Sequence, residues 1–476
     1  MDFELKNRLY LDGLKPKTRQ EIKKMLTMDN PKYLEAEKMN RFTKDIELNL
    51  KFYEENQDTL ICPRGAATQI YNLCQSHGEK IKIVDNRRLL NPVKITFHGE
   101  LRPLQQTTVK QGLRRDFGLL ESPTGAGKTI MALYMIAERK QPSLVVVHTK
   151  ELLNQWLDRI EQFLDIPKGE IGIIGGGKFK IGQKITVGMI QTLHKRAAEV
   201  MPHIGYLILD ECHRAPAMQY VKAIKEFDCK YMTGLTATPW RRDGLSKVIF
   251  WHIGDVTARI DKKDLLDNGN LCQAEVKWIK TKFNTLADAS GNYSKALSEL
   301  TEDYYRNRLI GDTVAKNKST GISLILSDRR EHCNELARVL SVENGIHTEV
   351  LTGATSKKER ERIIQDLQQG KCRYLIATGQ LVGEGFDLPE ISTMFLTTPI
   401  KFSGRVIQYI GRALRPAPGK EKAIIFDFVD VLNPVFKASA TSRVYTYQKQ
   451  KIVNQTVQNR QLKQNQKKLL NRQKLM

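Results

Sequence analysis

The stretch from Ser122 to Thr129 (Ser-Pro-Thr-Gly-Ala-Gly-Lys-Thr) constrains the fold more than any other part of the chain. A short apolar run at 117–120 precedes it, as in a buried strand, and residues 130–139 follow with the Ala, Met, Ile and Leu of a helix. A glycine-rich turn between a strand and a helix directs backbone N–H groups and the helix N-terminus at a polyphosphate. The pattern therefore predicts a nucleotide site, although Ser122 stands where the strict motif has glycine.

This stretch, the phosphate turn, also supplies the reactive groups of such a site. Lys128 is predicted to place its ammonium group against the β- and γ-phosphates, and Thr129 to hold Mg²⁺ through its hydroxyl. The residues predicted to wrap the phosphates are Thr124, Gly125, Ala126 and Gly127. On this stretch alone, an ordinary strand-to-helix turn remains the alternative.

The apolar runs that follow predict an α/β fold. They alternate with helical patterns between about residues 96 and 435, which is typical of parallel sheets covered on both faces. The runs are 144–147, 185–187, 207–209, 324–326, 374–377, 393–396 and 424–426. We predict two doubly wound sheets, at 96–262 and 263–435, with a linker near 259–270.

Residues 1–95 predict a smaller α/β domain. Strands are expected at 3–10, 59–62 and 80–84, and helices at 16–26 and 66–75. The helical patterns expose the basic side chains of Lys17, Arg19, Lys23 and Lys24. A DNA-binding accessory domain and a packing module with solvated charges fit this pattern about equally well.

The charge of the chain predicts a polyanionic partner. The formal net charge is +23 over 476 residues, which favours nucleic acid, with plain solubility as the alternative. Residues 431–476 carry ten Lys and Arg and no acid. Their apolar residues are too sparse for a core, so we predict that the tail at 436–476 is a solvated helix or disordered. Its charge suits an arm that contacts a phosphate backbone.

The seven cysteines are scattered and form no CxxC pair. An odd, dispersed set predicts reduced thiols in a cytoplasm, and no Cys-ligated metal centre. The first residues lack a signal-peptide core, and no apolar run reaches membrane-spanning length. We therefore expect a soluble protein without a membrane partner.

An acidic pair follows the apolar run at 206–209. Asp210 ends that run and Glu211 comes next. A carboxylate at the end of a buried strand can reach Mg²⁺ beside the phosphate turn, and the adjacent carboxylate can deprotonate the attacking water. We predict Asp210 as a metal ligand and Glu211 as the catalytic base.

Thr236 and Thr238 bracket an alanine after a further apolar run. With His213, they are predicted to couple the state of the nucleotide to domain movement. A β-turn at a strand edge is the alternative for this pattern alone.

Residues 408–415 (Gln-Tyr-Ile-Gly-Arg-Ala-Leu-Arg) predict a helix that carries Arg412 and Arg415 on one face. Arginine stabilises charge on a transferring phosphoryl group, and such a finger contributes about 10³–10⁵ in rate. We predict that both arginines and Gln408 are catalytic, with a solvated surface helix as the alternative. Because this motif belongs to the second predicted sheet, the prediction places the active site in an interdomain cleft.

In this order the motifs resemble those of superfamily-two helicases and translocases, in the branch of XPB-like, RadD-like and phage UvsW-like proteins. The resemblance covers about residues 98–430. The phosphate turn is similar to motif I, 210–213 to motif II as a DECH variant of the DEAD/DEAH group, 236–238 to motif III and 408–415 to motif VI. The resemblance implies two tandem RecA-like domains, ATP hydrolysis and a nucleic-acid track. It also implies that the expected cytoplasm is that of a bacterium or of the host of a phage that encodes the protein.

The resemblance also implies single site residues. The segment at 101–105 is similar to the adenine-recognition segment, in which Gln105 and Arg102 would read the base. Gly385 and Asp387, in the segment similar to motif V, would couple the nucleotide to the nucleic-acid path. The segments similar to motifs Ia, Ib, IV and V supply the candidate phosphate contacts Thr149, Lys150, Gln191, Thr192, Ser327 and Thr378. For each of these six, a loop-end cap is the alternative.

XPB-like proteins carry an Arg-Glu-Asp element after motif III, which they use on branched or opened DNA. This chain has Arg241, Arg242 and Asp243 there, so the element is imperfect. The extra charge makes Arg241 and Arg242 predicted nucleic-acid contacts. A short N-terminal α/β domain also matches the layout of XPB-like and UvsW-like proteins.

We therefore predict an ATP- and Mg²⁺-dependent DNA helicase or translocase acting on forked or branched DNA, in replication, recombination or repair. Recombination, replication or nuclease proteins are its expected partners. Two alternatives stay open: the motor subunit of a nuclease or defence complex, and an RNA helicase. The intact Lys128, Asp210, Glu211 and Arg412 disfavour a non-catalytic DNA-binding protein.

Overall fold

The computed structural model divides the chain into two compact units, Met1–Asp264 (unit 1) and Leu265–Met476 (unit 2). The residues it describes are 1–214, 218–239, 244–269, 271–285, 289, 291–317, 321–379, 388, 390–400, 409–411, 413–417, 420, 422–449 and 452. Each unit is described by itself below. The finer predicted division, with boundaries after 95, 262 and 435, stays a prediction.

Unit 1 begins with a five-stranded sheet in the order β5-β6-β2-β1-β7. Its strands are β1 (Asp2–Leu5), β2 (Leu9–Asp12), β5 (Glu54–Asn56), β6 (Thr59–Cys62) and β7 (Lys82–Asp85). The helices α1 (Pro16–Met25) and α3 (Ala67–Ser76) accompany this sheet, and α2 (Pro31–Lys38) lies between the strands of the β3 (Thr27–Asp29) and β4 (Asn49–Lys51) hairpin in the sequence. Leu9, Leu11, Ile22, Leu60 and Ile70 form its buried core.

The predicted single strand at 3–10 is wrong, because the chain reverses within it. β1 and β2 pair antiparallel, with Phe3 opposite Leu11, and the turn closes through a hydrogen bond from Lys6 N to Arg8 O of 2.9 Å. The sequence alternates apolar and polar residues on both sides of this tight turn. The alternation therefore did not reveal where one strand ends and the next begins.

The N-terminal sheet is packed firmly onto the larger sheet of unit 1. The buried guanidinium of Arg64, in the 3₁₀ turn η1 (Arg64–Ala66), donates to the carbonyl of Cys229 at 2.8 Å and lies over the ring of Phe117 at 5.7 Å. Arg87 also lies over that ring, at 5.5 Å. A Cβ on Gly65 would lie 2.5 Å from Gly254 N. No side chain fits at that approach, so the two parts of unit 1 contact each other closely.

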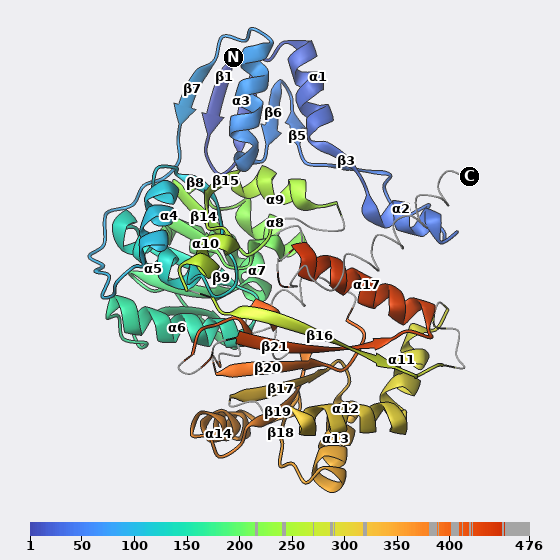
Figure 1. The fold of residues 1–476 in the computed structure, drawn as a ribbon. Helices are drawn as coiled ribbons and strands as arrows, with labels where there is room; N and C mark the ends of the chain where they lie inside the picture. Colours follow the sequence, from blue (N-terminus) through green and yellow to red (C-terminus); the bar gives the residue numbers. More distant parts are fainter. Residues whose placement is uncertain are drawn as a thin grey trace. The chain divides into compact units, whose positions relative to one another are not determined.

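The larger sheet of unit 1 has eight strands in the order β11-β10-β12-β9-β13-β14-β8-β15. Figure 1 labels β8, β9, β14 and β15 of this sheet. They are β8 (Phe117–Glu121), β9 (Ser143–Val147), β10 (Gly172–Gly175), β11 (Lys178–Lys180), β12 (Ile185–Met189), β13 (Tyr206–Leu209), β14 (Tyr231–Thr236) and β15 (Val256–Arg259). All pairs are parallel except β10–β11. Polar loops therefore gather at one edge, where the parallel strands end.

Helices connect these strands in the alternation that the sequence predicted. They are α4 (Pro103–Leu113), α5 (Lys128–Arg139), α6 (Lys150–Leu164), α7 (Ile190–Val200), α8 (Met218–Ile224) and α9 (Ser246–Ile253), with 3₁₀ turns η2 (Met201–His203) and η3 (Cys212–Arg214). The helix α10 (Lys262–Asp267) follows the last strand and runs across the boundary between the two units in the sequence. Ile190, Leu193, Tyr220 and Ile249, from α7, α8 and α9, share one buried cluster with Leu207 of the sheet.

Unit 2 is built on a parallel sheet in the order β16-β21-β20-β17-β19-β18. Its strands are β16 (Gln273–Thr281), β17 (Ile322–Ser327), β18 (Glu349–Leu351), β19 (Tyr374–Thr378), β20 (Ile391–Leu396) and β21 (Lys422–Asp430). Its helices are α11 (Tyr293–Glu302), α12 (Tyr304–Lys316), α13 (Arg330–Arg338), the π-helix η4 (Val339–Glu343), α14 (Lys357–Gln368) and α17 (Pro434–Lys449). The predicted pair of parallel α/β sheets is confirmed.

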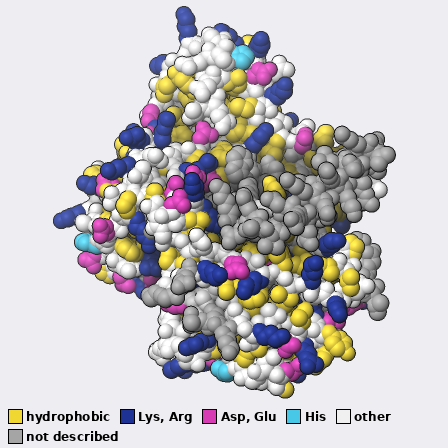
Figure 2. All heavy atoms as spheres, in the orientation of Figure 1, with side chains coloured by type: hydrophobic (Ala, Val, Ile, Leu, Met, Phe, Trp, Pro, Cys, Tyr) yellow, Lys and Arg dark blue, Asp and Glu magenta, His cyan; other side chains and the backbone are white. Residues whose placement is uncertain are grey.

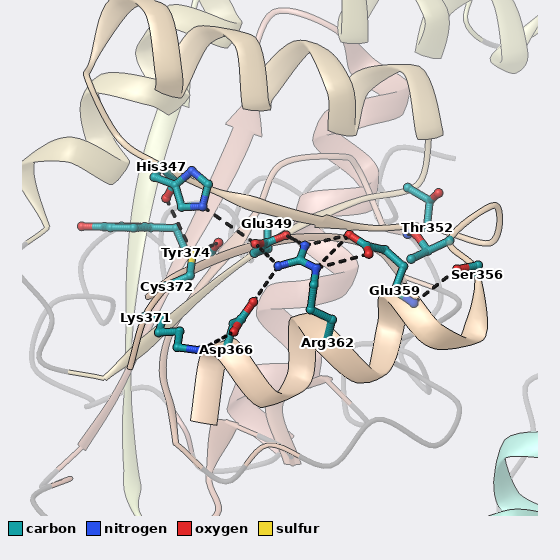
Figure 3. A network of polar contacts seen from close by, with 11 residues as sticks. His347, Glu349, Thr352, Ser356, Glu359, Arg362, Asp366, Lys371, Cys372 and Tyr374 are labelled. Carbon is teal, nitrogen blue, oxygen red and sulfur yellow. Dashed lines mark hydrogen bonds and ion pairs between the residues drawn. The ribbon is translucent and has the colours of Figure 1, made fainter. Parts of the chain in front are cut away.

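An exposed ion-pair network holds α14 against the edge strand β18 (Figure 3). Arg362 of α14 donates to both oxygens of Glu349 on β18, at 3.1 and 2.9 Å. It also contacts Glu359 and Asp366 of its own helix, at 2.7 and 2.6 Å. Lys371 reaches Asp366 at 3.3 Å. The hydrogen bond with Glu359, followed by the one with Glu349, raises the pKa of Arg362.

The C-terminal segment differs from the prediction of a solvated or disordered tail over the part that the structure describes. α17 buries Phe436, Ala440 and Tyr447. Its Arg443 is 1% exposed and donates through Nε and Nη2 to the Asp427 carboxylate of β21, at 2.9 and 2.7 Å. The prediction missed this packing because it counted only apolar residues, whereas a buried ion pair anchors the helix. The residues beyond 452 lie outside the described part.

Figure 2 shows Lys and Arg side chains spread over the visible face and mixed with Asp and Glu. On that face, the described surface therefore carries no single basic patch. Within the described ranges, no helix is both long and apolar enough to span a bilayer. All seven cysteines lie in these ranges, and each is buried and free of disulfide bonds.

Candidate nucleotide and nucleic-acid sites

The phosphate turn lies between β8 and α5, as predicted from the sequence. Gly125 and Gly127 have φ angles of +90° and +84°, a backbone region that favours glycine. Gly127 is the N-cap of α5, so the turn opens directly onto the helix N-terminus. Lys128 Nζ donates to the carbonyl of Ser122 at 3.2 Å. The structure thus brings the predicted Thr124-to-Thr129 group into one glycine-dependent turn.

The segment predicted to read adenine is tied to this turn. Gln105, at 4% exposure, donates through Nε2 to the carbonyl of Ala126 at 2.8 Å and accepts from Arg102 N at 2.9 Å. A Cβ on Gly127 would lie 2.4 Å from this same Nε2. Gln105 therefore fixes the turn in this structure, and base reading by Gln105 or Arg102 stays a prediction.

Asp210 and Glu211 follow β13 at the edge where the parallel strands end. Asp210 is 7% exposed; its Oδ2 accepts from Trp156 Nε1 and its Oδ1 from Glu211 N, both at 2.9 Å. Burial, followed by the neighbouring charge of Glu211, raises the pKa of Asp210. Burial alone would also raise the pKa of Glu211, but the contact with His213 and the charge of Lys128 outweigh it and lower that pKa. Glu211 is therefore held as the anion that a general base requires.

Glu211 adopts a strained backbone. Its φ angle is +48°, in the left-handed region that non-glycine residues occupy at an energetic cost. Its carboxylate Oε2 lies 3.2 Å from His213 Nδ1. Such strain persists only where the surroundings impose it, and it often occurs at functional sites.

The three predicted coupling residues form a continuous chain from Glu211. His213 Nδ1 lies 3.4 Å from Thr236 Oγ1, which donates to the carbonyl of Thr238 at 2.9 Å. Thr238 N donates back to Thr236 Oγ1 at 3.1 Å. The carbonyl of Thr236 accepts from Ser122 N at 3.0 Å. The acidic pair, the phosphate turn and the end of β14 are thus joined by direct polar contacts, of which the one between Glu211 and His213 is an ion-pair contact.

These residues fit a nucleotide with a hard divalent cation. Thr129 and Asp210 offer the hydroxyl and carboxylate oxygens that Mg²⁺ prefers. The described residues contain no cluster of three or more His, Cys, Asp or Glu placed around one metal. Mg²⁺ bound together with a nucleotide commonly takes only one or two protein carboxylates, so the donor set is sufficient.

Four of the nucleic-acid candidates of unit 1 lie at the end of two adjacent strands. β9 and β12 pair in parallel, and Thr149 and Gln191 follow them. Thr149 caps α6 by accepting from Leu152 N at 3.3 Å, and Lys150 begins that helix with an exposed side chain. Gln191 donates to the carbonyl of His148 at 2.8 Å, and Thr192 follows it on α7. The structure gathers all four residues at one sheet edge.

In unit 2, Ser327 and Thr378 are partners in the parallel register of β17 and β19. Ser327 is 1% exposed and its Oγ lies 2.9 Å from His332 Nδ1, so its hydroxyl is engaged within the protein. Arg415 is half-buried, and its carbonyl accepts from Lys420 Nζ at 2.7 Å. The remaining predicted site residues lie outside the described part; they are Arg241, Arg242, Gly385, Asp387, Gln408 and Arg412.

The sequence reasoning missed Trp156. It occupies the buried stripe of α6 with Leu153, Leu157 and Ile160, so its spacing resembles that of an ordinary core residue. Its hydrogen bond to Asp210 spans 54 positions. No local pattern carries that information.

Comparisons with known proteins agree with this geometry. The family described as Type III restriction enzyme, res subunit matches residues 98–241, and Helicase conserved C-terminal domain matches 305–417. DNA 3'-5' translocase XPB2 of Sulfurisphaera tokodaii is 28% identical, covering 66% of this chain and 79% of its own. Putative ATP-dependent RNA helicase L396 of Acanthamoeba polyphaga mimivirus is also 28% identical, covering 75% of this chain and 69% of its own.

A solved fragment of a putative HsdR subunit of a type I restriction enzyme from Vibrio vulnificus shares the fold. The TM-score is 0.55 at 19% identity, over 72% of this chain and 68% of that one. The two matched domains and the phosphate turn define an ATP-driven helicase built from two tandem RecA-like domains. Within that class, the chain belongs to the superfamily-two helicases, in the XPB-like branch. The family predicted from the motifs is confirmed.

Proposed function

We propose that this chain hydrolyses ATP to move along DNA and to open forked or branched DNA. The chain is an ATP-dependent helicase by its family, and the Sulfurisphaera relative, a DNA 3'-5' translocase, supports DNA as the track. The observation that carries the proposal is the chain of polar contacts from Glu211 through His213 to Thr236 and Thr238 beside the phosphate turn. This chain links the hydrolytic groups at the end of β13 directly to the end of β14.

The site residues of both units take distinct roles in this proposal. Lys128 binds the phosphates within the turn that Gly125 and Gly127 shape, and Glu211 accepts the proton of the attacking water. Thr129 and Asp210 would hold Mg²⁺, which neutralises charge on the phosphates when bound. Arg412 and Arg415, with Gln408, are proposed to stabilise the transferring phosphoryl group.

The proposed preference for forks rests on how the N-terminal domain is attached. Arg64, Arg87 and Gly65 pack it against the strand that leads into the phosphate turn and against the end of α9. A domain fixed in this way would move with the nucleotide-binding sheet. A fork junction held by that domain would therefore stay at a constant distance from the nucleotide-binding sheet. Thr149, Lys150, Gln191 and Thr192 would meanwhile advance along one strand of the DNA.

The test is an ATPase and unwinding assay of the full chain on single-stranded, linear duplex, forked and four-way DNA, and on matched RNA. We expect DNA to stimulate hydrolysis, forked DNA to be opened faster than linear duplex, and Lys128→Ala to abolish both activities. Equal opening of forked and linear duplexes would contradict the fork preference. Stronger stimulation by RNA than by DNA would contradict the choice of track.

A second candidate is the motor subunit of a DNA-cleaving complex. The match of residues 98–241 to a restriction-enzyme subunit family favours it. Such a subunit would hydrolyse ATP on linear duplex DNA without opening forks by itself. The fork arm of the same assay therefore separates the two candidates. The mimivirus relative, a putative RNA helicase, makes the RNA arm necessary.

A further inference from the structure

Trp156 stands out among the buried side chains of unit 1 because its polar atom is directed at the predicted metal ligand. The side chain is 1% exposed and lies two turns into α6. Its Nε1 donates to Asp210 Oδ2 at 2.9 Å, across 54 positions of the sequence. An indole N–H can only donate, so the contact requires an acceptor oxygen at that point.

The hydrogen bond fixes the orientation of the Asp210 carboxylate. The other oxygen, Oδ1, accepts from Glu211 N at 2.9 Å, which is a contact with the neighbouring backbone. One main-chain donor leaves the carboxylate free to rotate about its bond to Cβ. A second donor, from a rigid ring on a different element, removes that freedom. Trp156 is held in turn by the core around Leu153, Leu157 and Ile160.

We propose that Trp156 is a positioning residue, which orients the Asp210 carboxylate to receive the divalent cation that accompanies the nucleotide. The inference deepens the proposed function and rests on it. Side chains that hydrogen-bond to metal ligands set the ligand's orientation, and replacing them typically costs about 10–100-fold in metal affinity or activity. Trp156 meets this description by its geometry. The alternative is a core tryptophan whose N–H merely finds an acceptor.

The test compares Trp156→Phe with a matched control, Trp251→Phe. Trp251 belongs to α9 of the same unit, is 2% exposed and packs 5.2 Å from the ring of Phe52. Both substitutions remove an indole and keep an aromatic ring. Mn²⁺ binding in the presence of ADP, followed by electron paramagnetic resonance, gives the cation affinity without turnover. ATPase rates against Mg²⁺ and against ATP give the separate half-saturation values.

We expect Trp156→Phe to weaken Mn²⁺ binding by about tenfold and to raise the Mg²⁺ half-saturation by a similar factor. At saturating Mg²⁺, the KM for ATP should change less. Trp251→Phe should leave all three values unchanged. Unchanged Mn²⁺ affinity in Trp156→Phe would overturn the inference. Equal weakening in both variants would also overturn it, because the effect would then come from packing.

A second measurement uses the wild-type chain and stays decisive if Trp156→Phe does not fold. The indole N–H signals of ¹⁵N-tryptophan-labelled protein are recorded with ADP, before and after Mg²⁺ is added. We expect one signal to shift, to remain in Trp251→Phe and to lose its response in Asp210→Ala. The absence of any responding signal would overturn the inference. If the wild type binds Mg²⁺ and ADP but lacks DNA-stimulated ATPase, the proposed function fails and this inference is still tested.

Discussion

Asp210 in unit 1 and Asp427 in unit 2 are both buried carboxylates, but their surroundings differ. Both hydrogen-bond donors of Asp210 are neutral, namely the indole of Trp156 and the backbone of Glu211. Asp427 receives two N–H groups from the Arg443 guanidinium, at 2.9 and 2.7 Å, and the hydroxyl of Tyr447 at 2.8 Å. The Asp210 carboxylate is oriented by neutral donors, with the nearby charge of Lys128 in its favour, whereas the Asp427 carboxylate is neutralised by a bound guanidinium.

The pKa shifts follow this difference. Burial and the charge of Glu211 raise the pKa of Asp210, so its anion is disfavoured in the fold. Burial alone would lower the pKa of Arg443, but Asp427 raises it. An unpaired buried charge costs stability and is retained where a ligand will use it. A paired buried charge costs much less and specifies packing, here that of α17 on β21.

The comparison predicts that the unit 1 site can be altered with a loss of activity and little loss of stability. Replacing Glu211 by Gln removes the proposed base while keeping its size. We expect the ATPase rate to fall by about 10²–10⁴-fold, with an unchanged melting temperature. Glu161→Gln, an exposed carboxamide substitution on α6, is the matched control and should keep full activity. If Glu211→Gln hydrolysed ATP at the full rate, Glu211 would not be the catalytic base, and the assignment of a functional role to the unit 1 site would be wrong.

For Asp427→Asn in unit 2 we expect a loss of stability, in contrast to the loss of activity expected for Glu211→Gln. The Arg443 side chain, 2% exposed, would be left as a buried charge without its counter-ion. Breaking a buried pair in this way costs about 3–5 kcal/mol. Hydrogen exchange of the β21 and α17 amides in the full chain measures this loss locally.

The double variant Asp427→Leu with Arg443→Met sharpens that prediction. Apolar replacement of both partners is often close to neutral, so protection of β21 should largely return. If the double variant is as unstable as Asp427→Asn, the hydrogen bonds of the pair to other groups, such as Tyr447 and the carbonyl of Ile400, must also contribute to stability.

A smaller, pH-dependent effect is expected at His332 in unit 2. Its Nδ1 lies 2.9 Å from Ser327 Oγ and its Nε2 lies 3.0 Å from Asn307 Oδ1. Burial, with a smaller effect of Arg306, lowers its pKa to about 3. Below pH 6.5, His332 binds a proton in the unfolded chain but stays neutral in the folded state. The free energy of unfolding therefore decreases as the pH falls from 6.5 towards 3.

Between pH 8 and pH 5, this histidine should cost about 2 kcal/mol of stability. Urea unfolding at the two pH values should show that His332→Gln loses this acid sensitivity. His347, whose side chain is 77% exposed, provides the control, because His347→Gln should keep the wild-type pH dependence. The same acid sensitivity in wild type and His332→Gln would show that other groups cause it.

Local patterns predicted most of the elements. The apolar runs at 144–147, 185–187 and 207–209 lie in β9, β12 and β13, because buried parallel strands need continuous apolar stretches. The phosphate turn was predictable since its glycines, lysine and threonine act within a few residues. The reversal between β1 and β2 was missed because alternation looks the same on both sides of a tight turn.

By itself, the sequence determined which segments become strands and helices, where the phosphate turn lies and which superfamily the chain belongs to. These properties depend on neighbouring residues and on motifs in a fixed order. Only the tertiary structure decided that Trp156 holds Asp210 and that Arg443 neutralises Asp427. Such contacts depend on burial, which removes water as a competing partner and is set by residues far apart in the chain.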